Sequence, residues 1–419
     1  MVDGSYCFLA HTNPRTIYSL LHLPSIPPYI VLSSTMLLLK TSTKPIITTT
    51  LSCSKRSITM KSFADSSFDV DRYLSCRPSY PQEVYDIILA YHFNFSPSRS
   101  GPYKGGNTRF LDLGCGPGFV ASTLAPHFEH TLGLDPSKKM VDIGLQPVRG
   151  EKVEYRVGNA EDLDSAGVGV GDQGVDLVVA GQAAHWFDHS KVWPQLTKHV
   201  RPGGTVAYLG YAELFFPSHP HLTHFFTSFS SSPPPNGIGP YWSQPGRGIV
   251  EGLLDRVPFP VMPTLRRGHG EGEVEVGAEM ERIVGRRPVF INEAKLESSS
   301  DTPQGYEKGW ARETAMRIRH TPISPFLMRQ HWTLAQLDAY LRTFSATHEY
   351  WRMNPQDQAK EKAKAKIKAK VGDVEGDVVD RFMAVIKEAF EKEGAVDKDG
   401  NGSFDVAWPL VLMMIKKNL

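Results

Sequence analysis

The sequence predicts an α/β fold: a doubly wound, Rossmann-like and mostly parallel seven-stranded sheet with an antiparallel C-terminal strand and an irregular, aromatic and proline-rich insertion. Three observations predict it. Between Met60 and Tyr211, short apolar runs of strand length alternate with segments of helical character, as in βαβ units. A glycine-rich turn follows the first of these runs. A last apolar run, 404–415, follows a helical segment and is expected to close the sheet.

Strands and helices can be assigned in order as far as residue 211. Pro81 suits the first turn of a helix over 81–92, where its missing N–H costs nothing. Ser137 is the expected N-cap of a short helix, because its hydroxyl can accept from a free backbone N–H. The run 175–180 is apolar almost throughout, which indicates a strand buried on both faces. We expect strands at 109–113, 131–134, 153–157, 175–180 and 205–211, helices at 120–124, 137–141 and 191–199, and a sharp turn at 201–204.

The chain divides by composition into a leader, 1–59, and a domain, 60–419. The leader is poor in acidic residues, mildly basic and rich in Ser and Thr, which is typical of a mitochondrial transit peptide. A disordered leader, or an extension upstream of a domain that starts at Met60, is the favoured interpretation. We expect a cytoplasmic protein, or a mitochondrial one if the leader acts as a transit peptide. Within the domain we expect a cofactor-binding core at 66–211, a substrate-side insertion at 212–330 with a mobile loop at 268–280, and C-terminal helices and the closing strand at 331–419.

The C-terminal part contains two helical patterns, at 333–346 and 380–391, and a Lys- and Ala-rich stretch at 359–370 that predicts a solvated helix or tether. The segment 397–404 copies the first half of an EF-hand loop. Its twelfth position is Trp408 instead of a bidentate Glu, so an ordinary Asp-Gly turn is favoured over calcium binding.

The bulk composition excludes several classes of protein. The 419 residues carry a net charge of +1, which argues against a dedicated nucleic-acid binder. The four cysteines are scattered and form no metal-ligand spacing, and the longest apolar run of the leader is too short to span a bilayer. We therefore expect a monomer that binds a small molecule, with no nucleic-acid, membrane or metal partner.

The strongest chemical signal is the sequence DLGCGPG, which begins at Asp112 and lies between a predicted strand and helix. Glycine lets the backbone turn tightly and approach a ligand where a Cβ would collide. The following helix start offers free N–H groups to a carboxylate. Dinucleotide enzymes place GxGxxG at the same point, but here the spacing is GxGxG with Asp112 two positions before the first glycine. A carboxylate suits an ammonium group and not a pyrophosphate, so a ligand with an amino-acid end is favoured.

Polar residues also end the next two strands. Asp135 ends the second strand, where a carboxylate can accept both hydroxyls of a ribose. Asn159, Ala160 and Glu161 follow the third strand, where the backbone and the Asn159 amide could contact an adenine edge. Each residue alone is more often a turn or cap than a ligand, but their order at successive strand ends predicts a nucleoside site.

With the segments GLDPSKKM, GNAEDL, GQAAHWF and RPGG, the chain resembles class I S-adenosylmethionine-dependent methyltransferases. RYLSCRPSYP, GPYWSQPGR and VAWPLVL are similar to fungal small-molecule enzymes of the trans-aconitate methyltransferase type, within methyltransferase type 11. The resemblance covers 66–262 well and 320–419 more loosely. It implies S-adenosyl-L-methionine as cofactor. Many relatives carry Asp where this chain has Asn159. The resemblance implies that Asp112, Gly114, Gly116 and Gly118 hold the methionine end, that Asp135 holds the ribose, and that Ala160 and Glu161 lie beside the adenine. Further cofactor contacts are expected at Tyr73, Pro136, Met140, Asn159 and Gln182.

The methyl acceptor is expected between the fourth strand's end and the irregular region, because doubly wound folds bind ligands at the carboxyl edge of the sheet. His185 could act as a base for a hydroxyl acceptor, or serve only in packing. Trp186, Tyr241 and Trp242 would suit a planar acceptor and Arg247 could clamp its carboxylate, although a core role is about equally expected. Arg77 and Tyr80 could belong to a lid with Tyr73, or Arg77 could only brace its loop.

The leading hypothesis is methyl transfer to a small molecule, at a carboxylate or a hydroxyl, with a trans-aconitate-like acid as one candidate. Two alternatives stay open: a nicotinamide-dependent oxidoreductase on the same fold, and a catalytically silent protein that keeps the cofactor pocket.

Overall fold

The computed structural model describes residues 70–93, 108–260, 290–291, 309–321, 325–358 and 376–419. The chain divides into two units, Met1–Arg56 and Ser57–Leu419, and every described residue belongs to the second. The predictions for the leader, for the loop at 268–280 and for the stretch at 359–370 lie outside the described residues.

The second unit is built on one mixed sheet. Its strands run in the order β3-β2-β1-β4-β5-β9-β7-β6. The first five of these are parallel neighbours, β9 is antiparallel to β5, and β7 is antiparallel to β9. This confirms the predicted doubly wound, mostly parallel sheet with an antiparallel C-terminal strand. The strands of the predicted part are β1 (Arg109–Leu113), β2 (His130–Asp135), β3 (Val153–Val157), β4 (Val175–Gly181), β5 (Val200–Tyr211) and β9 (Phe404–Lys417).

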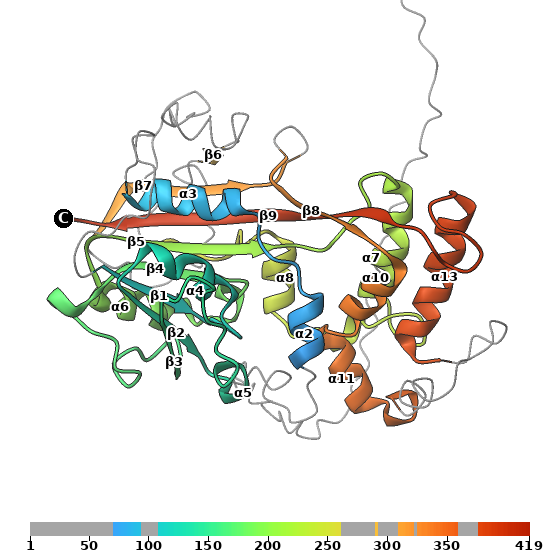
Figure 1. Ribbon diagram of the computed structural model, residues 1–419, viewed down its shortest axis with the longest axis horizontal. Helices are drawn as coiled ribbons and strands as arrows, with labels where there is room; N and C mark the ends of the chain where they lie inside the picture. The colour runs from blue at the N-terminus through green and yellow to red at the C-terminus, as the bar shows by residue number, and fades with distance from the viewer. Residues whose placement is uncertain (1–69, 94–107, 261–289, 292–308, 322–324, 359–375) are drawn as a thin grey trace, which may run out of the picture. The chain divides into compact units, whose positions relative to one another are not determined.

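The sheet contains more than the seven predicted strands. β7 (Trp310–Arg319) completes the path of seven, the two-residue β6 (Phe290–Ile291) extends its edge, and β8 (Leu327–Trp332) pairs with the first half of β9. β9 is 14 residues long, so β8 and β7 pair with it one after the other, and Figure 1 shows it as the longest strand. The segment 212–330, predicted to be irregular, therefore contributes regular strands.

The predicted sharp turn at 201–204 needs correction. These residues lie within β5, whose partner β4 pairs Val175 with Val200 but Leu177 with Thr205. The residues between these two pairs bulge out of the ladder, and Gly203 adopts a φ of 72°. The Pro-Gly-Gly sequence thus forms a bulge inside one strand and does not separate two elements.

The helix before β1 and the helices between the parallel strands follow the prediction. They are α3 (Gln82–Phe93), α4 (Phe119–Leu124), α5 (Lys138–Val141) and α6 (His189–His199). Ser137 is the N-cap of α5, as predicted, and its side chain accepts a hydrogen bond from Met140 N–H. The structure adds α2 (Val70–Cys76), α7 (Thr223–Ser231) and α8 (Gly246–Glu251).

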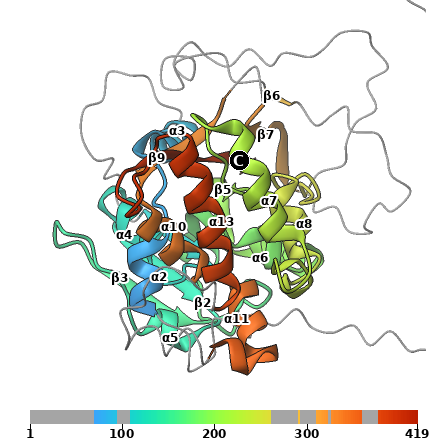
Figure 2. The ribbon, with the colours of Figure 1, turned by 90° about the vertical axis from the view of Figure 1, so that its right-hand side faces the viewer.

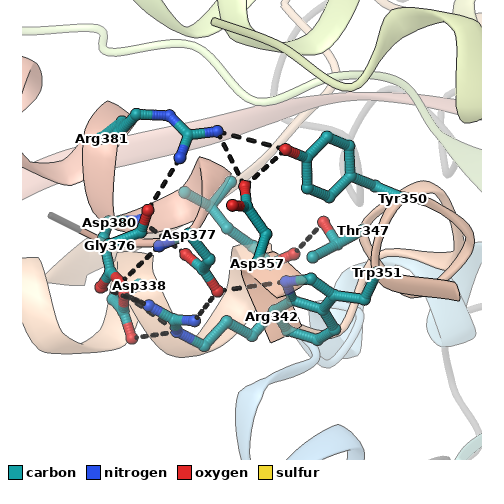
Figure 3. A network of polar contacts seen from close by, with 11 residues as sticks. Asp338, Arg342, Thr347, Tyr350, Trp351, Asp357, Gly376, Asp377, Asp380 and Arg381 are labelled. Atoms are coloured by element: carbon teal, nitrogen blue, oxygen red, sulfur yellow. Dashed lines mark hydrogen bonds and ion pairs between the residues drawn. The ribbon is translucent and has the colours of Figure 1, made fainter. Parts of the chain in front are cut away.

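The helix predicted at 333–346 is broken into α10 (Leu334–Leu341) and α11 (Ser345–Met353). The Thr343 hydroxyl donates to Tyr340 O and the Thr347 hydroxyl donates to Leu341 O, so side chains satisfy carbonyls that a continuous helix would bond. The predicted helix at 380–391 is α13 (Val378–Lys392). α10 lies between α2 and α13, and α13 lies beside α7 (Figure 2). A buried network of polar contacts, in which Arg342 and Trp351 both donate to Asp377, joins α10, α11 and α13 (Figure 3).

Two apolar cores lie on the two faces of the sheet. Successive residues of one strand point to opposite faces. Phe110 accordingly packs with α3 and α4, whereas Leu111 packs with α6 and residues 254–259. The first core continues into α7, α10 and α13, so the C-terminal helices and the sheet share one apolar interior.

The EF-hand-like segment is a closed turn. The Asp397 carboxylate accepts from Asp399 N–H, Asn401 N–H and the Asn401 amide, which uses the oxygens that a cation would need. Within the ranges that the structure covers, no three His, Cys, Asp or Glu side chains are grouped as metal ligands. No helix in the same ranges has the length and apolar character needed to cross a membrane.

Candidate functional site

A cavity of about 180 Å³ opens at the carboxyl ends of β1, β2 and β4, next to the position where the strand order reverses. Its wall is completed by residues before α3, by α8 and by the start of α11. Most of the predicted site residues line it, although they come from separate segments. They are Tyr73, Asp112, Gly114, Gly116, Asp135, Met140, Gln182, His185, Trp186, Trp242 and Arg247.

Asp135 and the glycine loop meet, as the prediction requires. One carboxylate oxygen of Asp135 accepts from Gly116 N–H at 2.9 Å, and the other accepts from Ser137 N–H at 2.8 Å. Burial raises the pKa of Asp135, while these two hydrogen bonds lower it. Each oxygen keeps a second lone pair, so the carboxylate can still accept from a ligand hydroxyl.

Asp112 is a buried carboxylate with one unused oxygen. Its side chain is 1% exposed, and Oδ2 accepts from Ala121 N–H at 2.8 Å. Oδ1 is buried and has no hydrogen-bond partner among the described residues, yet the side chain lines the cavity. Burial raises the pKa of Asp112 to about 8, against the effect of the Ala121 hydrogen bond. An ammonium group in the cavity would satisfy Oδ1 and restore the charged form.

The three predicted glycines differ in what surrounds them. All have positive φ: 72° at Gly114, 54° at Gly116 and 103° at Gly118. A Cβ on Gly116 would meet nothing within 4 Å, so this backbone faces open space. A Cβ on Gly118 would lie 2.0 Å from the Tyr155 hydroxyl oxygen. Gly118 does not line the cavity, and its positive φ together with the close packing of Tyr155 requires glycine there.

Gly118→Ala should therefore lower the free energy of unfolding by roughly 2–4 kcal/mol, since left-handed strain adds to displacement of a packed ring. Gly116→Ala is the matched control on the same loop. It should cost about 1 kcal/mol, because only the backbone strain applies. Urea-induced unfolding of both variants measures the difference, and equal losses would contradict the packing role of Gly118.

Gln182 connects β4 to β5 at the edge of the cavity. Its φ of 52° is unusual for a non-glycine residue. Its side-chain amide donates to Tyr211 O at 3.0 Å and accepts from Tyr211 N–H at 2.9 Å. The strained backbone is thus fixed by two hydrogen bonds, as is typical of residues that shape a site.

The remaining predicted residues lie outside the cavity lining. Asn159 and Pro136 are exposed, and Ala160 is packed in the core on the α6 side. Glu161 accepts from Asp188 N–H and so ties the loop after β3 to the start of α6. Tyr241 accepts from the Asn354 amide and packs edge-on against Tyr350. The adenine contacts expected at 159–161 remain a prediction.

His185 and Trp186 form part of the wall, with ring centroids 4.8 Å apart. His185 Nδ1 is buried without a partner among the described residues. Burial lowers the pKa of His185 to about 3, so the imidazole is neutral at physiological pH and a weak base. This environment favours a hydrogen-bonding role for the ring over proton abstraction.

Arg247 is at the cavity wall but is already neutralised. Its guanidinium pairs with Glu213 and with Glu251, the latter at 2.7 Å, and lies 4.1 Å from the centroid of the Trp242 ring. To bind a carboxylate of the acceptor, as predicted, Arg247 would need a guanidinium that is not already paired. In the structure this guanidinium forms ion pairs with Glu213 and Glu251. Arg77, which sequence reasoning assigned to a lid or brace, is the other arginine of the lining.

Tyr211 and Ser345 are among the parts of the wall that the sequence analysis did not predict. Tyr211 ends β5, so the rule that ligands bind at carboxyl strand ends could have identified it. Ser345 starts α11, far along the chain, and no local pattern marks it.

Comparisons with known proteins agree with this geometry. Residues 111–208 match the methyltransferase domain family. A probable S-adenosylmethionine-dependent methyltransferase of Saccharomyces cerevisiae is 25% identical over 175 residues, which cover 41% of this chain and 55% of the yeast protein. An uncharacterized methyltransferase of Mycobacterium tuberculosis is 30% identical over 156 residues, covering 37% of this chain and 54% of that protein.

A solved structure from Anaeromyxobacter dehalogenans, assigned as a type II methyltransferase, aligns with 81% of this chain and 97% of its own, at 19% identity and a TM-score of 0.44. The chain spans about half the length of the curated relatives it matches. The sheet order and the cavity beside the glycine loop agree with this match of residues 111–208 to the methyltransferase domain family.

Proposed function

We propose that the protein transfers the methyl group of S-adenosylmethionine to an oxygen of a small organic acceptor, a carboxylate or a hydroxyl. The observation that carries the proposal is one cavity lined both by Asp112, Gly116 and Asp135 and by the aromatic residues Trp186 and Trp242. Direct transfer of a methyl group requires that cofactor and acceptor bind next to each other. A cavity with a polar end for the cofactor and an apolar end for the acceptor meets this requirement.

The residues of the cavity fit the cofactor. Asp112 Oδ1, buried and unpaired among the described residues, would accept from the ammonium group. Gly116 has the room for close backbone approach, and Asp135 can accept from the ribose hydroxyls. When bound, S-adenosylmethionine supplies an electrophilic methyl group on a positively charged sulfur.

The acceptor side must align a nucleophile and exclude water. An acceptor oxygen forms the new O–CH₃ bond as the S–CH₃ bond breaks, and the sulfur keeps the electron pair. A carboxylate acceptor has no proton to lose, so it needs no general base. A hydroxyl acceptor releases one proton, and His185, with its pKa lowered to about 3 by burial, is a poor acceptor for it. The site therefore favours a carboxylate over an unactivated hydroxyl.

The test is incubation of the full chain with methyl-labelled S-adenosylmethionine and a panel of small acids and hydroxyl compounds, including trans-aconitate. We expect label in an organic product and binding of S-adenosylhomocysteine but not of NAD. Cofactor binding without transfer to the panel or to any small molecule of a cell extract would favour the silent binding protein. Binding of NAD in place of S-adenosylhomocysteine would favour the oxidoreductase.

A further inference from the structure

Arg77 lies in the cavity wall in a fixed position. One of its terminal nitrogens donates to Thr343 O at 3.1 Å, and the other donates to the Tyr211 hydroxyl at 3.4 Å. Its guanidinium lies 5.0 Å from the centroid of the Tyr73 ring. The rings of Tyr340 and Phe344 stand at 5.5 and 5.7 Å. The cation is therefore held by aromatic faces and by a backbone carbonyl from the corner between α10 and α11.

Among the described residues, no carboxylate lies within ion-pair distance of the Arg77 guanidinium. Other arginines that are largely buried do form an ion pair with a carboxylate. Arg247 pairs with Glu213, Arg342 with Asp377 and Arg317 with Asp255. Arg77 Nε is buried and, in the part of the chain described, has no hydrogen-bond partner. An enclosed cation costs free energy unless an anion compensates it, and here the space beside it is the cavity.

We propose that Arg77 is the group that binds a carboxylate of the methyl acceptor, the part that the sequence suggested for Arg247. The inference rests on the proposed function, because it assigns the acceptor to that same cavity. The contacts of Arg77 come from residues 340–344, Tyr73 and Tyr211, and none of them comes from the glycine loop 114–118. Phe344 also packs against Trp242 at 5.3 Å, so Arg77 shares its wall with the aromatic acceptor side.

The arrangement defines a class of acceptor. Guanidinium and carboxylate are both planar and form paired hydrogen bonds, and the aromatic residues beside Arg77 favour a flat, unsaturated skeleton. A carboxylate engaged by Arg77 is a weakened nucleophile, so the oxygen that receives the methyl group belongs to a second group of the same molecule. The acceptor is thus an unsaturated or aromatic acid with at least one further carboxylate or hydroxyl.

The experiment compares carboxylates with their neutral amides. Full-length protein saturated with S-adenosylhomocysteine is titrated with benzoate, cinnamate and fumarate, and with benzamide, cinnamamide and fumaramide, by calorimetry. The variants are Arg77→Met, Arg77→Lys and, as a matched control, Arg329→Met, which removes an exposed arginine of β8. We expect wild type and Arg329→Met to bind at least one carboxylate and to discriminate against its amide.

Arg77→Met should weaken that carboxylate roughly 10- to 100-fold, the range of a lost hydrogen bond to a charged group, and leave the amide unchanged. Arg77→Lys should recover part of the loss. The Kd for S-adenosylhomocysteine should stay within about twofold in all variants, which separates this inference from the proposed function. If no carboxylate binds better than its amide, or if Arg77→Met weakens S-adenosylhomocysteine as much as the carboxylate, the assignment is overturned. Failure of wild type to bind S-adenosylhomocysteine would instead overturn the proposed function.

Discussion

Arg342→Met should lower the free energy of unfolding by roughly 3–5 kcal/mol, the largest stability loss that we expect from a single side chain. Arg342 is 6% exposed and pairs with Asp338, Asp377 and Asp380 at 2.8–2.9 Å (Figure 3). Asp377 is fully buried and also accepts from the Trp351 indole N–H. Removing the guanidinium would leave this carboxylate buried without its cation, which is the costly half of breaking a buried ion pair.

The pH dependence tests this explanation. Burial raises the pKa of Asp377 even with Arg342 in place, because the charged form is poorly solvated. Without Arg342 the pKa should rise further, and protonation at low pH would then remove the unpaired charge. The loss in Arg342→Met should therefore be smaller at pH 5 than at pH 8.

Two further variants serve as controls, each measured by urea-induced unfolding. Arg352→Met breaks an exposed pair with Glu349 and should change stability by no more than about 0.5 kcal/mol. Asp377→Asn in the Arg342→Met background should recover part of the loss, because asparagine is neutral and is still a good N-cap for α13. The ion-pair explanation fails if Arg342→Met is as stable as Arg352→Met.

This network also bears on the cavity. Arg342 directly precedes Thr343, whose carbonyl accepts from Arg77, and Ser345 at the start of α11 lines the wall. The ion pairs thus fix the corner between α10 and α11 against α13, and that corner positions the cation proposed to bind the acceptor. Residues 342–345 therefore contain both the arginine of the stabilising ion pairs and residues that contact Arg77 or line the cavity.

The cofactor half of the site could be predicted from the sequence because its parts are local. The carboxyl ends of neighbouring parallel strands meet at one edge of a sheet, so Asp112 at the end of β1 and Asp135 at the end of β2 had to lie near the glycine loop. The hydrogen bond from Gly116 N–H to Asp135 is the direct consequence.

The acceptor half could not be predicted because its charges depend on distant partners. Arg247 is neutralised by Glu213, which lies 34 residues earlier, and no pattern in either segment signals the pair. Arg77 is a candidate for binding the acceptor because no carboxylate of the described residues forms an ion pair with it, and the sequence alone cannot show this. β7 was missed for a similar reason: its register shifts between Ala311 and Met316, which interrupts the alternation that predicts a strand.

Asp112→Asn should weaken cofactor binding strongly while leaving the fold at least as stable as wild type. Oδ1 of Asp112 is buried and without a partner in the described structure, so the ionised carboxylate is poorly solvated and its pKa is raised to about 8. The unfolded chain has an ordinary pKa near 3.8 for this group. Between these two pKa values the folded state binds more protons than the unfolded chain. The stability that comes from the protonated form is therefore lost as pH rises from the unfolded pKa through the folded pKa of about 8. Asparagine has no charge to desolvate, so the cofactor-free variant should exceed wild type in stability most clearly at pH 8.

The same shift predicts a proton linked to binding. At pH 7 the cofactor-free carboxyl is mostly protonated, and an ammonium group that binds it requires the charged form. S-adenosylhomocysteine should therefore release close to one proton on binding at pH 7, and its affinity should fall as pH decreases from 8 to 6. Calorimetry in phosphate and in Tris, whose ionisation enthalpies differ, measures the number of protons. In Asp112→Asn we expect no proton release and a Kd weakened roughly 100-fold or more, since one partner of a buried charge pair is gone.

Loss of binding in a variant of undiminished stability cannot be attributed to unfolding, and this makes Asp112 a sharper probe than the glycines beside it. A substitution at Gly114 or Gly118 strains the backbone as well as the site, since a Cβ would lie 2.5 Å from Ala183 Cβ or 2.0 Å from the Tyr155 hydroxyl. Asp112→Asn preserves size and the hydrogen bond from Ala121 N–H and removes only the charge. Unchanged affinity and unchanged proton release in this variant would mean that the cavity holds its cofactor without a carboxylate–ammonium contact, and the unpaired Oδ1 would then need another explanation.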